Sequence, residues 1–175
     1  MFRKGLILAA LAAAFFPAIA KADFQQGDLE LTLGGSANGG RDFDGFAAGV
    51  NVSLGYFATD QLEIGIRQSI NYNDVSSPPN AGGQLNGSTR VFGDFHFDLG
   101  AWQPFIGANI GFVYGDGVAD TWEAAPEGGV KYFLNSTTFV FAQVEYQFFF
   151  DKADQVDDAF SEGQFVYSLG LGVKF

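Results

Sequence analysis

Apolar and polar side chains alternate along most of this chain with a period of two residues. The C-terminal segment shows this most clearly: from Phe165 to Phe175 every odd position is apolar, and most even positions are small or polar. Such alternation is typical of a β-strand with one apolar and one polar face. A soluble domain rarely carries a strand to its last residue, because termini fray. The ending therefore favours a strand of a closed barrel whose apolar face meets lipid.

The same alternation recurs in several earlier segments. The clear ones run over 29–36, 46–56, 62–72, 90–99, 106–114 and 140–148. A weaker one covers 122–133 and is interrupted by Pro126, where we predict a bulge or an early strand end because proline has no amide hydrogen to donate. Together these segments predict eight strands of roughly the 9–11 residues that a tilted membrane strand needs. We therefore predict an all-β fold, an eight-stranded antiparallel up-and-down transmembrane barrel.

The connections between these strands alternate in length. Short ones are predicted at 57–61, 100–101 and 135–137, and longer ones at 38–45, 73–87, 115–121 and 151–163. Outer-membrane barrels have short periplasmic turns and longer outer loops. With an even number of strands, both termini are then expected on the periplasmic side.

The N-terminus has the pattern of a secretory signal peptide. Arg3 and Lys4 precede an apolar run over 5–20, and small residues lie around Ala20 and Ala22. The apolar run is too short for a transmembrane helix. We predict a signal peptide over 1–22, cleaved near Ala20 or Ala22, and a barrel over 23–175.

Composition and charge exclude several classes of function. Charged residues make up 17 % of the chain, below the roughly 25 % of soluble domains, and the chain has 24 glycines. Without the three cations of the predicted signal, 6 Lys+Arg stand against 20 Asp+Glu, which gives −14. Nucleic-acid binding needs a basic surface and is not expected. The chain has no cysteine, which excludes disulfides and cysteine metal sites. We expect no cofactor.

Aromatic residues lie near the ends of the predicted strands, where two girdles are expected at the membrane interfaces. The predicted girdle residues are Tyr56, Tyr72, Trp102, Tyr114, Trp122, Tyr132, Phe150 and Phe165. The alternative is that aromatics are simply common in strands.

Charged side chains on the polar face of each strand predict an interior network. Its predicted members are Glu30, Glu63, Arg67, Arg90, Asp94, His96, Asp98, Glu127, Lys131, Glu145 and Lys174. Single buried charges are costly, so these residues should pair or be hydrated. We predict that Arg67 pairs with Asp94, and that Glu63, Asp98, Lys131 and Lys174 form a second cluster at the periplasmic end.

The predicted network has two functional interpretations. One is an ion path. The other, which we favour, is a polar plug, because an eight-stranded barrel is only just wide enough for its own side chains. His96 is the only histidine and is expected to face inward with Asp94 and Asp98. A metal or catalytic site would need more ligands or an exposed nucleophile, so we interpret His96 as a hydrogen-bonded interior residue.

The longer connections are acidic. Their acidic residues are Asp42, Asp44, Asp74, Asp116, Asp120, Asp151, Asp154, Asp157, Asp158 and Glu162. They could gather divalent cations shared with lipopolysaccharide phosphates, or bind a basic partner. They lack the spacing of a calcium loop, and we favour a solvated, repulsive surface.

Two segments carry a resemblance to a known family: 126–133 with the short turn that follows it, and the terminal strand ending at Phe175. Over almost all of its mature length the chain resembles the small outer-membrane barrels of the OmpA/OmpX type and the wider porin family. The resemblance implies a monomeric integral outer-membrane protein, and our leading hypothesis is that it has no enzymatic activity. It also implies that the assembly machinery reads the last strand through Tyr167, Leu169, Leu171, Val173 and Phe175. The residues of this sequence contain no counterpart of the peptidoglycan-binding domain of full-length OmpA-like proteins, so cell-wall anchoring is not expected.

Outer-membrane lipid A deacylases are also eight-stranded barrels, and they use a His/Ser pair on the lipid face. Here Ser88, the candidate nearest to His96, is expected in a loop, so this activity is not supported. Our leading hypothesis is a structural or surface-interaction role in the outer membrane, among lipid and lipopolysaccharide, with a possible extracellular partner at the loops. The alternatives are a narrow porin-like channel and, less favoured, a soluble periplasmic lipocalin-like binding barrel.

Overall fold

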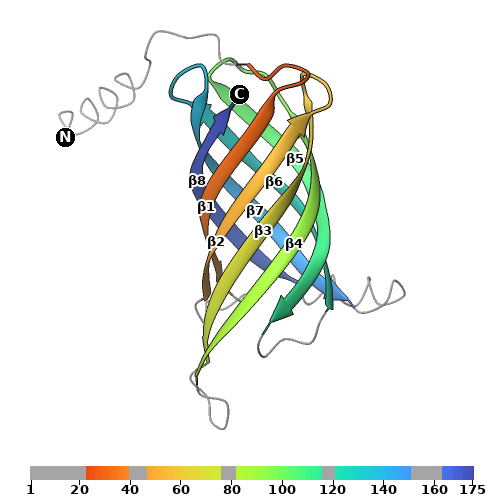
Figure 1. Ribbon diagram of the computed structural model, residues 1–175, viewed down its shortest axis with the longest axis vertical. Helices are drawn as coiled ribbons and strands as arrows, with labels where there is room; N and C mark the ends of the chain where they lie inside the picture. Colours follow the sequence, from red (N-terminus) through yellow and green to blue (C-terminus); the bar gives the residue numbers. More distant parts are fainter. Residues whose placement is uncertain (1–22, 40–46, 76–81, 116–120, 151–162) are drawn as a thin grey trace, which may run out of the picture.

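The structure is a computed structural model that describes residues 23–39, 47–75, 82–115, 121–150 and 163–175. The predicted signal peptide, 1–22, lies outside the described residues. Eight strands form a closed antiparallel barrel in sequence order, which confirms the predicted fold class (Figure 1). The strands are β1 Leu29–Gly39, β2 Ala47–Phe57, β3 Leu62–Val75, β4 Gly82–His96, β5 Trp102–Gly115, β6 Thr121–Phe133, β7 Thr138–Phe150 and β8 Gln164–Lys174.

The barrel closes between its first and last strands. β1 pairs with β8 from Glu30↔Lys174 to Gly39↔Phe165. Beyond that ladder, Leu29 N donates to Phe175 O at 2.9 Å and Phe175 N donates to Leu29 O at 2.9 Å. Closure lets neighbouring strands satisfy their backbone groups, as the lipid interior requires. None of the described residues forms a helix long and apolar enough to cross a membrane.

The barrel has two distinct ends. We call the end with the connections 58–61, 97–101 and 134–137 the turn end, and the opposite end the loop end. The C-terminus lies at the turn end, and β3 and β4 reach furthest toward the loop end (Figure 1).

Alternation places apolar side chains outside and most charged ones inside. Leu169 and Leu171 are 68 % and 58 % exposed, whereas Glu63 and Arg67 are 1 % and 5 % exposed. Apolar residues dominate the outer wall on every strand. This distribution contradicts the lipocalin-like alternative, which requires a dry apolar interior and a polar outer wall.

Pro126 neither ends β6 nor introduces a bulge, so this prediction was wrong. The β6–β7 register is the same on both sides of the proline, from Ala124↔Phe148 to Glu127↔Glu145. On the other edge Pro126 pairs with Ala108 in an uninterrupted β5–β6 ladder. The missing amide hydrogen therefore coincides with a local gap in the β6–β7 ladder and leaves the strand direction unchanged.

The predicted long connection over 73–87 is also wrong in its extent. β3 runs to Val75 and β4 begins at Gly82, and the two strands pair as far as Val75↔Gly82. Gly82, Gly83, Asn86 and Gly87 indicated a loop, yet they belong to the loop-end part of the β3–β4 hairpin. Ser88 is consequently a buried residue of β4 and not a loop residue.

The interior is not wholly polar, which corrects the expectation of a purely polar lumen. Phenylalanines such as Phe92, Phe105 and Phe139 are buried, and inward glycines of the adjacent strand make room for them. A methyl group at Gly129 would lie 2.7 Å from Cζ of Phe105, so that ring requires glycine there. Pairing of glycine with phenylalanine thus fills the narrow lumen without widening it.

Polar groups on the outer wall are satisfied locally. Gln68 Nε2 donates to the Tyr114 hydroxyl at 2.9 Å, and Thr89 Oγ1 donates to Gln68 Oε1 at 2.7 Å. The Tyr114 ring also lies against Gly87, where an added Cβ would be 2.7 Å from its Cε2. This triad keeps an otherwise costly amide hydrogen-bonded on a lipid-facing wall.

If the outer wall faces lipid, a charge midway along it should be far more costly than a charge at its edge. We expect Ile66→Arg, on an outward residue of β3, to destabilise the barrel by about 2–4 kcal/mol. Leu99→Arg, on an exposed residue of a turn, is the matched control and should cost about 0–1 kcal/mol. Urea unfolding in lipid vesicles measures both. Equal effects would contradict a membrane-spanning wall.

Candidate functional site

The interior near the turn end is organised around Lys131. Its ammonium donates to both oxygens of Glu30 at 2.6 Å and to Glu63 Oε2 at 2.9 Å. Glu63 Oε2 also lies 3.0 Å from His96 Nε2. All four residues are buried, so each charge relies on these partners rather than on water.

Phenylalanine rings surround this charged group. Phe24, Phe57, Phe133, Phe139 and Phe141 form a buried cluster, which we call the turn-end cluster. Phe24, from the segment before β1, stacks on Phe57 with 4.1 Å between ring centroids. The Lys131 ammonium lies 5.1 Å from the Phe24 centroid and 5.4 Å from that of Phe139, within cation–π range.

A second group, which we call the central network, lies closer to the loop end and is organised around Arg67. Its guanidinium binds Glu127 in bidentate fashion, at 2.7 and 3.2 Å, and Glu145 at 3.1 Å. Arg90 pairs with Glu145 and donates to Ser69 Oγ at 2.8 Å. Bidentate guanidinium–carboxylate pairs are among the strongest polar contacts in proteins. The central network therefore links β3 and β4 to β6 and β7 across the lumen.

The predicted Arg67–Asp94 pair is wrong. The β3–β4 register sets Arg67 opposite Arg90, and Asp94 opposite Glu63. Arg67 therefore reaches across the lumen to Glu127 and Glu145.

The predicted second cluster is correct only in part. Glu63 and Lys131 do meet, but Lys174 is half-buried at the rim, where it binds Asp28 Oδ2 at 2.8 Å. Asp98 is exposed in the 97–101 turn and accepts hydrogen bonds from Gly100 N and Gln103 Nε2 at 3.0 and 2.8 Å. Asp98 therefore does not face inward with Asp94 and His96, because β4 ends at His96.

Glu123 is a buried interior residue missing from the predicted set. Its Oε1 lies 3.4 Å from Arg90 Nε. The sequence alone could have identified Glu123, because Glu123, Glu127 and Lys131 are separated by even numbers of residues and therefore lie on the same face of β6. The assumption that Pro126 disturbs the strand concealed it. Phe24 was missed for another reason: it belongs to no strand, and alternation says nothing about it.

Glu63, Asp94 and His96 each bring a potential metal ligand within 4.8 Å of the others. Glu63 is already engaged by His96 and by Lys131. The Lys131 ammonium already occupies the cation position beside Glu63. The oxygens of Glu63 and Asp94 that make no hydrogen bond lean apart, toward Gly55 on β2 and Gly107 on β5.

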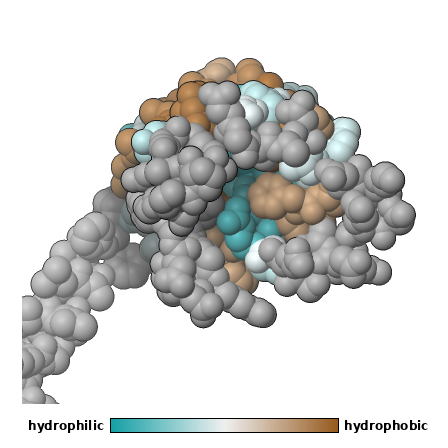
Figure 2. All heavy atoms as spheres, turned by 90° about the horizontal axis from the view of Figure 1, so that it is seen from below, coloured by the Kyte–Doolittle hydropathy of each residue, from teal (hydrophilic) through white to brown (hydrophobic). Residues whose placement is uncertain are grey.

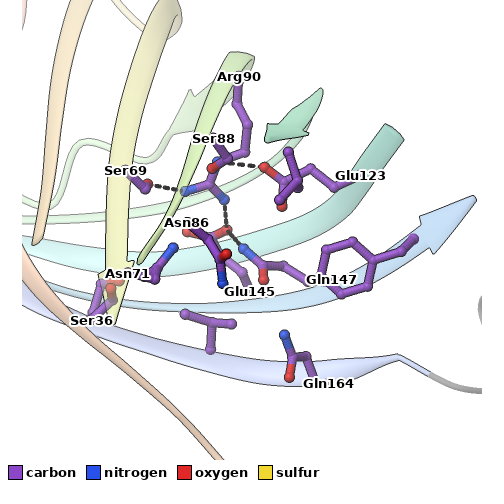
Figure 3. Close-up of a pocket in the computed structure, with 14 residues that line it drawn as sticks. Ser36, Ser69, Asn71, Asn86, Ser88, Arg90, Glu123, Glu145, Gln147 and Gln164 are labelled. Carbon is purple, nitrogen blue, oxygen red and sulfur yellow. Dashed lines mark hydrogen bonds and ion pairs between the residues drawn. The ribbon is translucent and has the colours of Figure 1, made fainter. Parts of the chain in front are cut away.

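On the loop-end side of the central network lies a cavity of about 150 Å³, which opens toward the loop end; we call it the loop-end cavity. Figure 2 shows the hollow at this end, with hydrophilic residues at its floor and a hydrophobic patch beside them. Arg90, Glu123 and Glu145 form its charged part (Figure 3). Phe149 also lines the cavity. The remaining polar lining consists of Ser36, Ser69, Ser88, Ser168, Asn71, Asn86, Gln147 and Gln164.

The predicted girdle residues lie on the outer wall. Tyr56, Tyr72, Trp102, Tyr114, Trp122 and Phe165 are exposed there, and Tyr132 and Phe150 are half-buried. Trp102 and Tyr132 pack together with 4.6 Å between ring centroids. The side chains of all ten acidic loop residues lie outside the described part of the chain.

No family model matches the chain, and no curated protein matches it. Solved structures do. OprG from Pseudomonas aeruginosa has a TM-score of 0.62 at 14 % identity, covering 87 % of this chain and 98 % of that one. The N-terminal β-barrel domain of OprF from the same organism has a TM-score of 0.58 at 19 % identity, covering 86 % and 98 %. Ail, the attachment invasion locus protein of Yersinia pestis, has a TM-score of 0.52 at 13 % identity, covering 86 % of this chain and 100 % of that one.

The fold is that of the small outer-membrane β-barrels. This confirms the expected structural resemblance to the OmpA/OmpX type. The structures that it resembles are bacterial outer-membrane proteins, and this chain has the apolar outer wall that such a location requires. At these identities the likeness concerns the fold, so the interior residues described above are features of this chain.

Removing the cation of the central network should be much more costly than removing the cation at the rim. We expect Arg67→Met to destabilise the barrel by about 3–5 kcal/mol, because Glu127 and Glu145 would lose their shared guanidinium. Lys174→Met applies the same change to a more exposed pair and should cost up to about 1 kcal/mol. Equilibrium unfolding in detergent compares the two. Similar losses would show that the central network carries no special stability.

Proposed function

We propose that this protein is a monomeric outer-membrane barrel with a closed interior and no catalytic activity. Its role is to stabilise the outer membrane and to present loops at the cell surface. In this arrangement the turn end faces the periplasm and the loop end faces the outside. Lipid and lipopolysaccharide surround the wall, and the assembly machinery reads the last strand through Tyr167, Leu169, Leu171, Val173 and Phe175.

One observation carries the proposal: two successive groups of buried side chains lie across the lumen. The turn-end cluster with Lys131 comes first, and the central network around Arg67 follows it. An ion would have to displace paired charges in both groups, and buried pairs are costly to break. Eight-stranded barrels have little space beyond their own side chains. A closed, rigid barrel follows from both arguments.

The absence of catalysis is supported by the surroundings of His96. This residue is 1 % exposed, contacts Glu63 and packs against the Phe24, Phe57 and Phe105 rings. A general base must reach its substrate, and no path to His96 is open in the part of the chain that the structure describes. The surface role agrees with the structural likeness to Ail, whose name describes attachment and invasion.

The second candidate is a narrow porin-like pore. The loop-end cavity favours this pore, because the cavity admits small solutes into the part of the lumen nearest the loop end. The inward glycines do not leave a further path: the space beside Gly65 is taken by Phe92, and that beside Gly111 by Arg90. Filling these glycines would therefore displace side chains rather than block an open channel.

Conductance in planar bilayers separates the two candidates. We expect no stable openings from the wild-type barrel. A variant that weakens both barriers, Phe24→Ala with the charge-balanced pair Arg67→Ser and Glu127→Ser, should conduct more than the wild type. Openings of this variant would show that the assay detects a pore. Stable wild-type openings would favour the porin-like channel instead.

Location and folding can be tested together. We expect the mature protein to fractionate with the outer membrane and to migrate differently on gels before and after boiling, because a closed barrel resists detergent until it is heated. Recovery in the soluble periplasmic fraction without detergent would contradict the proposal.

A further inference from the structure

The loop-end cavity has the size of a site for one small ring. Its volume is about 150 Å³, and side chains from β1 and from β3 to β8 line it. An apolar cavity of about this volume in another protein binds benzene, a single six-membered ring. Concave sites with several convergent polar groups are the usual ligand sites of proteins. The lining residues named here all belong to the described part of the chain.

The lining suits a ligand rich in hydroxyl groups. Four serine hydroxyls and four carboxamides face the cavity, and each of these groups both donates and accepts hydrogen bonds. Phe149 also lines the cavity and is 39 % exposed, which leaves part of its ring uncovered. A ring with polar edges and apolar faces matches both features, since its edges meet the polar groups and one face packs on Phe149.

Two oxygen acceptors in this lining lack hydrogen bonds. Asn86 Oδ1 is buried without a partner. Glu123 Oε1 makes no hydrogen bond and only faces Arg90 Nε at 3.4 Å. Buried acceptors without donors are costly, so a ligand that donates hydrogen bonds gains more here than one that accepts them.

The charges at the floor favour a cation and disfavour an anion. The terminal nitrogens of Arg90 already donate to Glu145 and to Ser69 Oγ, and its Nε faces Glu123 (Figure 3). Each of the three guanidinium nitrogens already faces a partner, which leaves this group little capacity for a phosphate or a carboxylate. Glu145 is compensated by both Arg67 and Arg90, whereas the Glu123 carboxylate has only the 3.4 Å contact with Arg90 Nε, so negative charge is left at Glu123. The whole chain is acidic as well. An ammonium is attracted by this field.

We propose that the loop-end cavity binds a single amino-sugar ring, with its hydroxyls on the serine and carboxamide groups, one face on Phe149 and its ammonium at Glu123. A linear diamine has no ring face to pack on Phe149 and no acceptor oxygen for the lining. A sugar phosphate would meet the carboxylates. The inference goes beyond the proposed function and does not depend on whether the barrel conducts.

Binding to the folded full-length mature protein in detergent tests the proposal by calorimetry with four probes. Glucosamine, glucose, glucose 6-phosphate and putrescine compare a cationic, a neutral and an anionic sugar with a cation that has no ring. Glucosamine should bind most tightly, glucose about tenfold more weakly, and the other two more weakly still, because a charged hydrogen bond contributes more than a neutral one. Equal or tighter binding of putrescine or glucose 6-phosphate overturns the proposal, as does no binding of glucosamine at millimolar concentration.

Variants locate the site. Glu123→Gln should lower glucosamine affinity about tenfold, to the level of glucose, and leave glucose unchanged. Asn86→Leu should weaken both sugars and serves as the second variant if Glu123→Gln does not fold. Thr32→Val is the matched control, because Thr32 is buried inside the barrel but does not line the cavity. Heat-dependent gel mobility verifies folding. Unchanged glucosamine affinity in a folded cavity variant, or a loss in Thr32→Val, places binding elsewhere and overturns the assignment.

Discussion

The pairing of β1 with β8 is the constraint on which the rest of the structure depends. Once the wall is closed, every strand residue points either to the outside or into a lumen of fixed width. A charged side chain that points inward cannot escape to water through an open edge, so it must find a partner across the barrel. The long-range pairs Lys131–Glu30 and Arg67–Glu127 follow from this confinement. They join strands that are distant in sequence and would be unrelated in an open sheet.

The interior charges do not balance. Among the described residues, six buried carboxylates stand against three buried Lys and Arg side chains. Each cation is therefore shared: Lys131 serves Glu30 and Glu63, Arg67 serves Glu127 and Glu145, and Arg90 serves Glu145 and Glu123. Sharing ties the strands that carry the two acids to the strand that carries the cation, because one cation must satisfy two acids at once.

Alternation predicted the strand number, the order and the outward set, because a period of two is a local property that each strand displays alone. It could not predict register, and the Arg67–Asp94 pair failed for that reason: Arg67 stands opposite Arg90. Glu123 was not predicted because we assumed that Pro126 disturbs the strand, although Glu123 and Glu127 lie on the same face of β6. The loop-end cavity and the turn-end cluster depend on which inward side chains share a level around the barrel. That property arises only when all eight strands are aligned.

The turn end connects closure to packing. Phe24 precedes β1, yet its ring stacks on Phe57 at the end of β2 and meets the edges of Phe133 and Phe139 on β6 and β7. The segment that carries Phe24 is tied to the last strand, since Lys174 donates to Asp23 O at 2.5 Å and to Asp28 Oδ2 at 2.8 Å. The position of Phe24 is therefore tied to the β1–β8 seam as well as to β2. Because Phe24 also covers Lys131, barrel closure, apolar packing and burial of the ion pairs at the turn end support one another.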